Sequence, residues 1–153
     1  YVFRKCYINL LLFLHHVPLI IIVTVLVNGR IDYTAFLSLP LGLLIVFINF
    51  IFFTSILGML GARYRDIEPT VKSLMPPMLL LTPILWKPEM LGEYADLIYW
   101  NPFVYFVGIV RDDLIGLPFD IYIWIGALII TFVQMLIFLI LYSKKRDRVV
   151  FWI

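Results

Sequence analysis

Charged residues are scarce in this chain, and cysteine is almost absent. Only 14% of the 153 residues are charged and 63% are hydrophobic, whereas roughly 25% of the residues in a soluble domain are charged. This balance excludes an ordinary soluble domain and favours an integral membrane protein, which we expect to bind no nucleic acid. The single cysteine, Cys6, excludes a disulfide within the chain.

Residue patterns that carry catalysis or cofactor binding are also missing. The sequence has no Ser/His/Asp set, no Cys/His metal spacing and no glycine-rich phosphate loop. His15 and His16 are adjacent and would point about 100° apart on a helix, so we interpret them as neutral residues bonded to neighbouring helices. We therefore predict a chain that is not an enzyme, with no metal and no cofactor of its own.

Three uncharged stretches are long enough to cross a bilayer. They cover residues 6–29, 33–62 and 121–143, and a shorter one covers 73–86. About 20 apolar residues span the hydrocarbon as a helix. We predict an all-α membrane protein with a single transmembrane domain over 1–153, whose spans are about 7–27, 36–60, 70–87 and 121–142.

The basic residues decide the number of crossings. Four crossings leave nine Lys and Arg residues inside and three outside, with three acidic residues inside and seven outside. Because basic residues stay on the cytoplasmic side during insertion, this split favours four crossings with both chain ends in the cytoplasm. The nine are Arg4, Lys5, Arg63, Arg65, Lys72, Lys144, Lys145, Arg146 and Arg148.

The third crossing differs from the others because prolines interrupt it. Asp66 is placed to cap its start, and Lys72 to reach back to the interface. Each proline removes a backbone donor, so neighbouring helices or a water-lined cavity must satisfy the freed carbonyls. A kinked packing helix and a helix that lines a pathway both remain open. The prolines inside this crossing are Pro76, Pro77 and Pro83.

Small and polar residues within the spans predict contacts between helices. The second crossing carries a stripe of small residues, which usually indicates close helix packing rather than chemistry. Uncharged polar residues in the spans predict interhelical hydrogen bonds. The stripe is Ser55, Gly58, Gly61 and Ala62, and the polar residues are Asn9, Thr24, Asn49, Thr54 and Gln134.

The segment between the third and fourth crossings, residues 87–120, is too long for a simple turn. Asn101-Pro102 divides its uncharged part into 97–100 and 103–110, and neither piece is long enough to cross. We predict two short re-entrant helices in an outer gate segment over 94–115. Its aromatic residues either anchor the chain at the headgroups or stack on sugar rings.

Several short motifs occur in an order that resembles the permease subunit of ABC-2 type polysaccharide exporters, which move O-antigen, capsule or teichoic acid chains. They cover about residues 50–153, and the first fifty residues match only as hydrophobic spans. The motifs are LGMLGARYRDI over 57–67, Leu81-Thr82-Pro83-Ile84 with Trp86, Asn101-Pro102-Phe103 followed by Arg111, and RVVFWI over 148–153.

The resemblance implies a six-helix permease of which this chain supplies the third to sixth helices, in the bacterial inner membrane. The chain begins with Tyr1 rather than methionine, and we expect it to be the later part of a longer protein. The partners implied are a second permease copy and two ATP-binding cassette subunits, which would hold ATP and Mg²⁺. The cargo implied is a lipid-linked polysaccharide.

Two groups of residues are predicted to serve this transport. The cytoplasmic turn Arg63, Tyr64, Arg65 and Asp66 is the candidate contact with the ATPase subunit, and a solvated loop is the alternative. The predicted substrate pathway comprises Trp86, Tyr99, Trp100, Tyr105, Phe106 and Arg111. Arg111 could contact an anionic substrate, but an ion pair with Asp112, Asp113 or a neighbour is the favoured interpretation.

Three alternatives to the polysaccharide exporter remain open. An ABC-2 permease for a drug or lipid would show a closed apolar slit instead of a wide aromatic-lined tunnel. A membrane-embedded lipid-phosphate transferase would use Asp112 and Asp113 with a metal. A structural or assembly membrane protein would have no ATP-hydrolysing partner.

Overall fold

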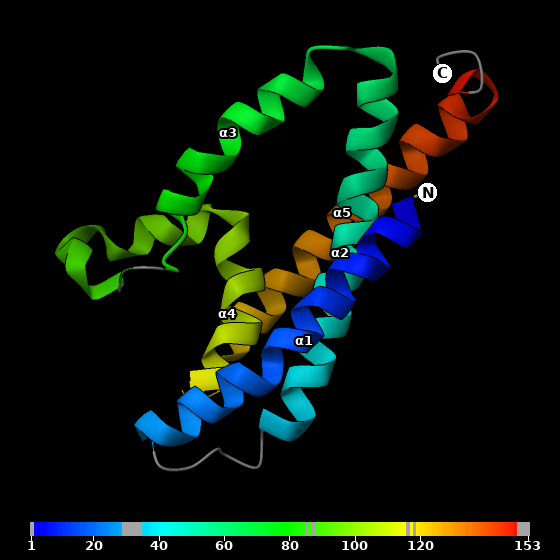
Figure 1. Ribbon diagram of the computed structural model, residues 1–153. Helices are drawn as coiled ribbons and strands as arrows, with labels where there is room; N and C mark the ends of the chain where they lie inside the picture. The colour runs from blue at the N-terminus through cyan, green and yellow to red at the C-terminus, as the bar shows by residue number, and fades with distance from the viewer. Residues whose placement is uncertain are drawn as a thin grey trace.

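The computed structural model is helical and contains no strand in the part it describes, which is residues 2–28, 35–84, 86, 88–115, 117 and 119–149. The predicted all-α class is therefore confirmed over these residues. Figure 1 shows α1 and α5 each running alongside α2, with α3 standing away from them. The elements are α1 (Val2–Asn28), α2 (Ala35–Arg63), α3 (Ile67–Leu81), the 3₁₀ helix η1 (Pro88–Trp100), α4 (Pro102–Ile115) and α5 (Ile121–Val149).

Two helices among the described residues are long and apolar enough to cross a membrane. They are Ser38–Arg63 within α2 and Ile121–Lys144 within α5, and only 11% of each apolar window is buried. The core helix of a soluble protein would be mostly buried, so these exposed apolar surfaces fit lipid. The full set of four crossings stays a prediction.

The buried core lies where α2, α4 and α5 meet. Ile45 of α2, Ile109 of α4, and Trp124 and Ala127 of α5 form its centre. Ile45, Trp124 and Ala127 all lie in the first halves of their helices. The packing of the described chain is therefore concentrated at one end of the bundle.

Glycines allow the core helices to approach closely. A Cβ atom on Gly42 of α2 would lie 2.9 Å from the backbone oxygen of Ile109. A Cβ atom on Gly126 of α5 would overlap the ring of Tyr105, and one on Gly108 would lie 2.9 Å from a methyl group of α5. Small residues at such crossings let helix backbones pack against each other.

The predicted small-residue stripe does not make the close packing expected of it. A Cβ atom on Gly58 or Gly61 would meet no atom of another described residue within 4 Å. Close approach occurs instead at glycines outside the stripe, because the α4 helix crosses α2 at Gly42, far from Gly58. Of the stripe residues, Gly58 is exposed, and Ser55, Gly61 and Ala62 are half-buried.

Two of the polar residues predicted to bond between helices, Asn49 and Thr54, do so, whereas Oε1 of Gln134 is buried and has no hydrogen-bond partner among the described residues. The Asn49 amide of α2 donates a hydrogen bond to the Thr131 hydroxyl of α5 at 3.5 Å. The Cys6 thiol of α1 donates to the Thr54 hydroxyl of α2 at 3.9 Å. Asn49 is only 7% exposed, so its hydrogen bond lowers the cost of placing an amide among apolar helices.

The start of α3 differs from the sequence prediction. Asp66 occupies the position before the helix, but its side chain makes no capping hydrogen bond because its backbone is already helical. Lys72 forms an ion pair with Glu68 one turn earlier, with the nitrogen and oxygen atoms 2.6 Å apart. This pair lies along the helix surface, because residues four apart in a helix are neighbours.

α3 continues through Pro76 and Pro77 and ends at Leu81, whereas the sequence predicted a span to residue 87. Thr82 is extended, with φ −92° and ψ 128°, because the ring of Pro83 disfavours a helical conformation in the preceding residue. At 15 residues, α3 is about 22 Å long. Residue 87 lies outside the described residues.

The outer segment contains two helices that separate at Asn101, where the sequence placed the division. η1 is bent at Gly92, whose φ of 55° suits a residue without a Cβ atom. The Asn101 side chain accepts the Phe103 N–H at 3.0 Å, and Pro102 takes the first helical position, so α4 has a favourable start. α4 extends beyond the predicted 103–110 to Ile115. Whether these helices are re-entrant stays a prediction.

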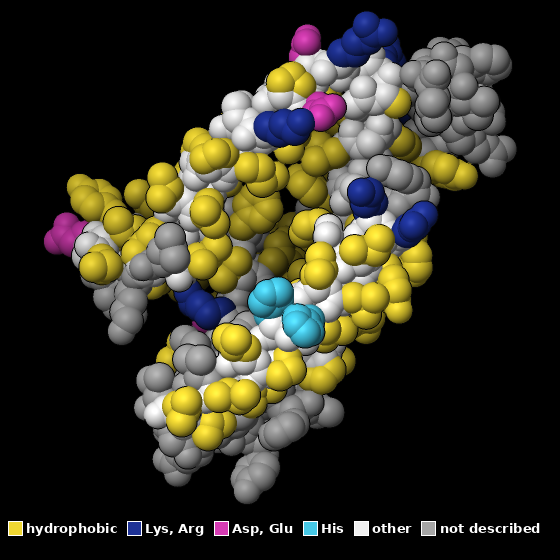
Figure 2. Space-filling model, viewed as in Figure 1, with side chains coloured by type: hydrophobic (Ala, Val, Ile, Leu, Met, Phe, Trp, Pro, Cys, Tyr) yellow, Lys and Arg dark blue, Asp and Glu magenta, His cyan; other side chains and the backbone are white. Residues whose placement is uncertain are grey.

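Basic side chains are unevenly distributed over the molecule. In Figure 1 the start of α1, the turn between α2 and α3, and the end of α5 lie toward the upper right of the view. In Figure 2 most of the visible Lys and Arg side chains gather around this region. The predicted topology places these three segments on the cytoplasmic side, and that placement stays a prediction.

Candidate functional site

Two of the sequence motifs contact each other where α3 ends and α4 begins. The Asn101 amide donates a hydrogen bond to the Thr82 hydroxyl at 3.0 Å. The Thr82 hydroxyl in turn donates to the Met78 carbonyl of α3 at 2.8 Å. Thr82 is only 2% exposed, so water does not compete strongly for these bonds. The last turn of α3 is thus fixed to the N-terminus of α4.

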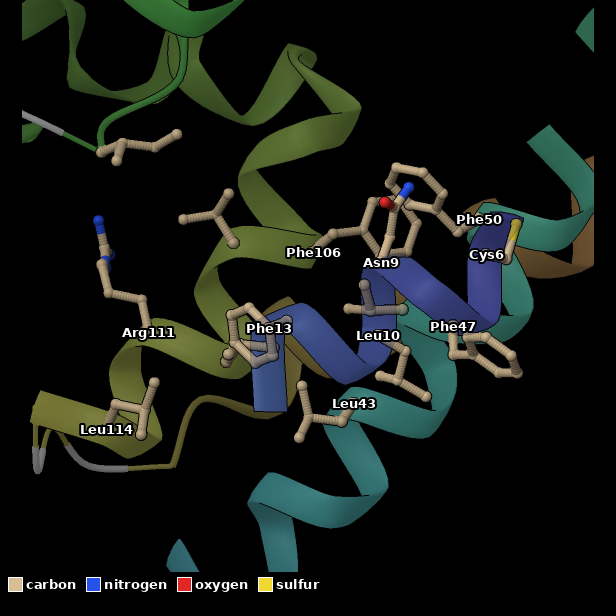
Figure 3. Close-up of a pocket in the computed structure, with 14 residues that line it drawn as sticks. Cys6, Asn9, Leu10, Phe13, Leu43, Phe47, Phe50, Phe106, Arg111 and Leu114 are labelled. Carbon is tan, nitrogen blue, oxygen red and sulfur yellow. The ribbon is translucent and has the colours of Figure 1, made fainter. Parts of the chain in front are cut away.

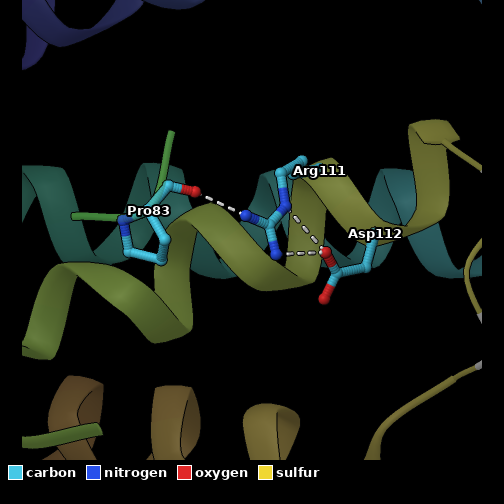
Figure 4. A network of polar contacts seen from close by, with 3 residues as sticks. All are labelled: Pro83, Arg111 and Asp112. Carbon is cyan, nitrogen blue, oxygen red and sulfur yellow. Dashed lines mark hydrogen bonds and ion pairs between the residues drawn. The ribbon is translucent and has the colours of Figure 1, made fainter. Parts of the chain in front are cut away.

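Arg111 of α4 forms a second link to the same segment (Figure 4). Its Nη1 atom donates to the Pro83 carbonyl at 2.5 Å. Its Nε and Nη2 atoms both lie 2.8 Å from Oδ1 of Asp112. The predicted ion pair with Asp112 is confirmed, and this neighbouring carboxylate balances the positive charge of Arg111. We call Thr82, Pro83, Asn101, Arg111 and Asp112 the α3–α4 junction.

The two adjacent aspartates of α4 have different surroundings. Asp112 pairs with Arg111, whereas Asp113 receives a hydrogen bond from Ser38 of α2. Burial raises the pKa of the Asp113 carboxyl, the Ser38 bond lowers it, and the charge of Asp112 raises it. Asp113 Oδ2 is buried and has no hydrogen-bond partner among the described residues.

No group of three or more His, Cys, Asp and Glu residues in the described chain is arranged to hold a metal ion. Asp112 and Asp113 are engaged separately by an arginine and a serine. The described side chains therefore offer no ligand set for the transferase alternative.

The predicted pathway aromatics fall into separate places. Trp86 turns back, and its indole N–H donates to the Leu80 carbonyl at 2.8 Å, satisfying an oxygen that the end of α3 leaves free. Trp100 is 87% exposed. Tyr99 and Tyr105 lie together, with ring centroids 6.3 Å apart, and the Tyr105 hydroxyl donates to the Tyr99 carbonyl at 2.9 Å. Among the described residues, Tyr99 and Tyr105 are the pathway aromatics from different helices that contact each other.

Phe106 and Arg111 border an apolar groove of about 700 Å³ between α1, α2 and α4. Figure 3 shows phenylalanine side chains of α1 and α2 around it. Sequence patterns gave no indication of this groove, because it forms from three helices whose apolar faces look alike. The lining residues are Cys6, Asn9, Leu10, Phe13, Leu43, Val46, Phe47, Phe50, Ile84, Phe106, Val107, Val110, Arg111 and Leu114.

The candidate ATPase contact forms a tight exposed turn between α2 and α3. The Tyr64 N–H donates to the Leu60 carbonyl at 2.8 Å, and the Ile67 N–H donates to the Tyr64 carbonyl at 3.2 Å. The Arg63 guanidinium lies 5.2 Å from the centre of the Tyr64 ring. Arg65 and Asp66 are exposed on the same turn. The geometry suits a small docking surface and a solvated loop equally well.

Comparison with protein families assigns the larger part of this chain to a family. Residues 1–115, which are more than half of the 153, match the family described as ABC-2 type transporter. The match includes the first fifty residues and ends before α5. No curated protein and no solved structure matched the chain. This chain belongs to the ABC-2 type transporter family.

Proposed function

We propose that this chain is a permease subunit that moves a lipid-linked polysaccharide across the bacterial inner membrane. Separate ATP-binding subunits hydrolyse ATP, and the transporter contains two permeases and two such subunits. The family assignment supports a transport role. The apolar surfaces of α2 and α5 support a membrane location.

The observation that carries the choice of cargo is the exposed aromatic surface of η1. Tyr94 is 68% exposed, Tyr99 is 44% exposed and Trp100 is 87% exposed. Sugar rings present apolar C–H faces, and stacking on aromatic rings gives repeated weak contacts that let a polymer slide. Burial and the carboxylates of Asp120 and Asp96 raise the pKa of Tyr99, so its phenol stays a neutral hydrogen-bonding group.

ATP binding drives the transport through a change of conformation. Closure of the ATP-binding subunits displaces the turn Arg63–Asp66, the two permeases rock, and a channel opens between them. A strong charge in the channel would trap an anionic glycan. Arg111 avoids this, because Asp112 balances its charge.

A second cargo class is favoured by one observation. The groove between α1, α2 and α4 is apolar, and its volume of about 700 Å³ lies within the usual range for small-molecule sites, roughly 300–1,000 Å³. An ABC-2 permease for a drug or lipid would use this groove as its cargo site. The same groove also suits the lipid end of a lipid-linked glycan.

Reconstitution of the full permease with its ATP-binding subunits tests the proposal. We expect lipid-linked glycan to stimulate ATP hydrolysis and Trp100→Ala to weaken that stimulation. Tyr122→Ala is the matched control, because Tyr122 is 80% exposed but lies on α5. Stimulation by apolar small molecules alone would favour the second cargo class. Purification of the chain without any ATP-hydrolysing partner would refute the transport proposal.

A further inference from the structure

The helix α3 has little support from the rest of the described chain between its two ends. None of its residues is buried, and it stands apart from the bundle in Figure 1. It begins at the exposed turn Arg63–Asp66 and ends at the α3–α4 junction. A helix held mainly at its ends transmits displacement along its axis, because its backbone hydrogen bonds keep its length fixed.

The α3–α4 junction holds α4 at two separated points. Asn101 lies before the first turn of α4, and Arg111 lies ten residues later, about 15 Å along the helix. The long Arg111 side chain reaches back to Pro83, as helical side chains lean toward the N-terminus. Because both bonds end on the adjacent residues Thr82 and Pro83, a movement of this pair displaces α4 as one body.

Burial and charge balance make these contacts suited to carry force. The side chain of Thr82 is 2% exposed, and Pro83 is fully buried. The bond from Arg111 to the Pro83 carbonyl has a charged donor, and such bonds are stronger than neutral ones. The Asp112 carboxylate balances the positive charge of the Arg111 guanidinium at the same time.

We infer that Thr82, Asn101 and Arg111 are positioning residues that couple α3 to α4, so that displacement of the cytoplasmic turn reaches the helix that borders the apolar groove. The inference rests on the proposed function for the source of that displacement. The residues touch no cargo in this role. They determine whether nucleotide binding moves α4.

The experiment measures movement of the outer segment without any cargo. The full permease is assembled with its ATP-binding subunits, Cys6 is replaced by serine, and spin labels are placed at Leu97 of η1 and Leu128 of α5. Both positions are more than half exposed. The label distance is measured by electron paramagnetic resonance without nucleotide and with a non-hydrolysable ATP analogue, and ATP hydrolysis is measured in parallel.

Thr82→Val removes the hydroxyl and keeps the side-chain shape. We expect the ratio of molecules with the nucleotide-dependent distance change to molecules without it to fall by roughly fivefold. This factor corresponds to the loss of one ordinary hydrogen bond. ATP hydrolysis should persist. Thr82→Ser should restore the movement, because serine keeps the hydroxyl.

Thr131→Val is the matched control, because Thr131 also accepts a bond from an asparagine of another helix and donates to a carbonyl four residues earlier. It should leave the distance change intact. Asn101→Ser keeps a residue that caps α4 well but removes the amide donor, so it tests the bond again where Thr82→Val fails to assemble. It should reproduce the loss.

The outcomes separate this inference from the proposed function. An assembled, ATP-hydrolysing transporter in which Thr82→Val and Asn101→Ser keep the full distance change would overturn the coupling role alone. The same holds if the unsubstituted transporter hydrolyses ATP with no movement of the labels. A permease that binds no ATP-hydrolysing subunit would overturn the proposed function, and the coupling role with it.

Discussion

A methyl group added at Gly42 should destabilise the chain, because α2 and α4 touch there backbone to backbone. The new Cβ atom would lie 2.9 Å from the Ile109 carbonyl oxygen. Ordinary carbon–oxygen contacts are longer by about 0.5 Å, so α4 must shift within its packed core, and overpacking of this kind costs about 1–3 kcal/mol.

The matched control is Gly58→Ala on the same helix. A Cβ atom at Gly58 meets no described atom within 4 Å. Both substitutions gain the same helix propensity, up to about 1 kcal/mol, so the difference between the two variants isolates the clash. We expect Gly42→Ala to be less stable than Gly58→Ala by about 1–3 kcal/mol.

Thermal unfolding of the detergent-purified chain measures this difference. For a chain of 153 residues, each kcal/mol shifts the midpoint by about 2–4 °C. The midpoint of Gly42→Ala should therefore lie several degrees below that of Gly58→Ala. Equal midpoints would show that α4 does not approach α2 as closely as the structure places it.

Three further predictions concern the core, an acidic group and a surface ion pair. Trp124→Ala should cost about 3–5 kcal/mol, because Trp124 is 7% exposed, whereas Tyr122→Ala, at an 80% exposed position, should leave the unfolding midpoint nearly unchanged. Burial raises the pKa of Asp113, so its carboxyl stays protonated to a higher pH in the folded chain than in the unfolded chain. In the unfolded chain an aspartate carboxyl titrates at about 4. The resulting stability is full below that pH and is lost as the pH rises through the raised pKa. In paired melting curves, the stability of Asp113→Asn relative to the parent chain should therefore increase as the pH rises above about 4. A constant difference between the two curves over that range would contradict this. Lys72→Ala should not change the midpoint, because Lys72 and Glu68 are both largely exposed and water screens such pairs; a clear loss would mean that another group covers the pair.

Much of the helical framework could be predicted from the sequence, because it depends on local properties. Uncharged length located α2 and α5, and Asn101-Pro102 located the start of α4, since asparagine caps a helix and proline suits its first turn. An ion pair of Arg111 was also predictable, because acidic residues follow it directly, but the sequence left Asp112, Asp113 and other neighbours open as the partner, and the structure shows Asp112.

Contacts between helices were harder to predict, since they depend on which faces meet. The stripe at Gly58 and Gly61 has the right spacing for close packing, yet the close approaches occur at Gly42 and Gly126. One helix alone carries no information about the crossing point of its neighbour. Trp86 illustrates the same limit, because nothing in its neighbourhood predicts that its indole returns to the Leu80 carbonyl.

The closely packed glycines of α2, α4 and α5 also matter for electrical insulation. A cell that stores energy as an ion gradient loses about 2.3 kcal/mol for each charge that leaks across 100 mV. Backbones in direct contact, as at Gly42 and Ile109, leave no gap wide enough for a hydrated ion. In the proposed permease, the contact that holds α2 against α4 is thus also a point at which no ion can pass between these two helices.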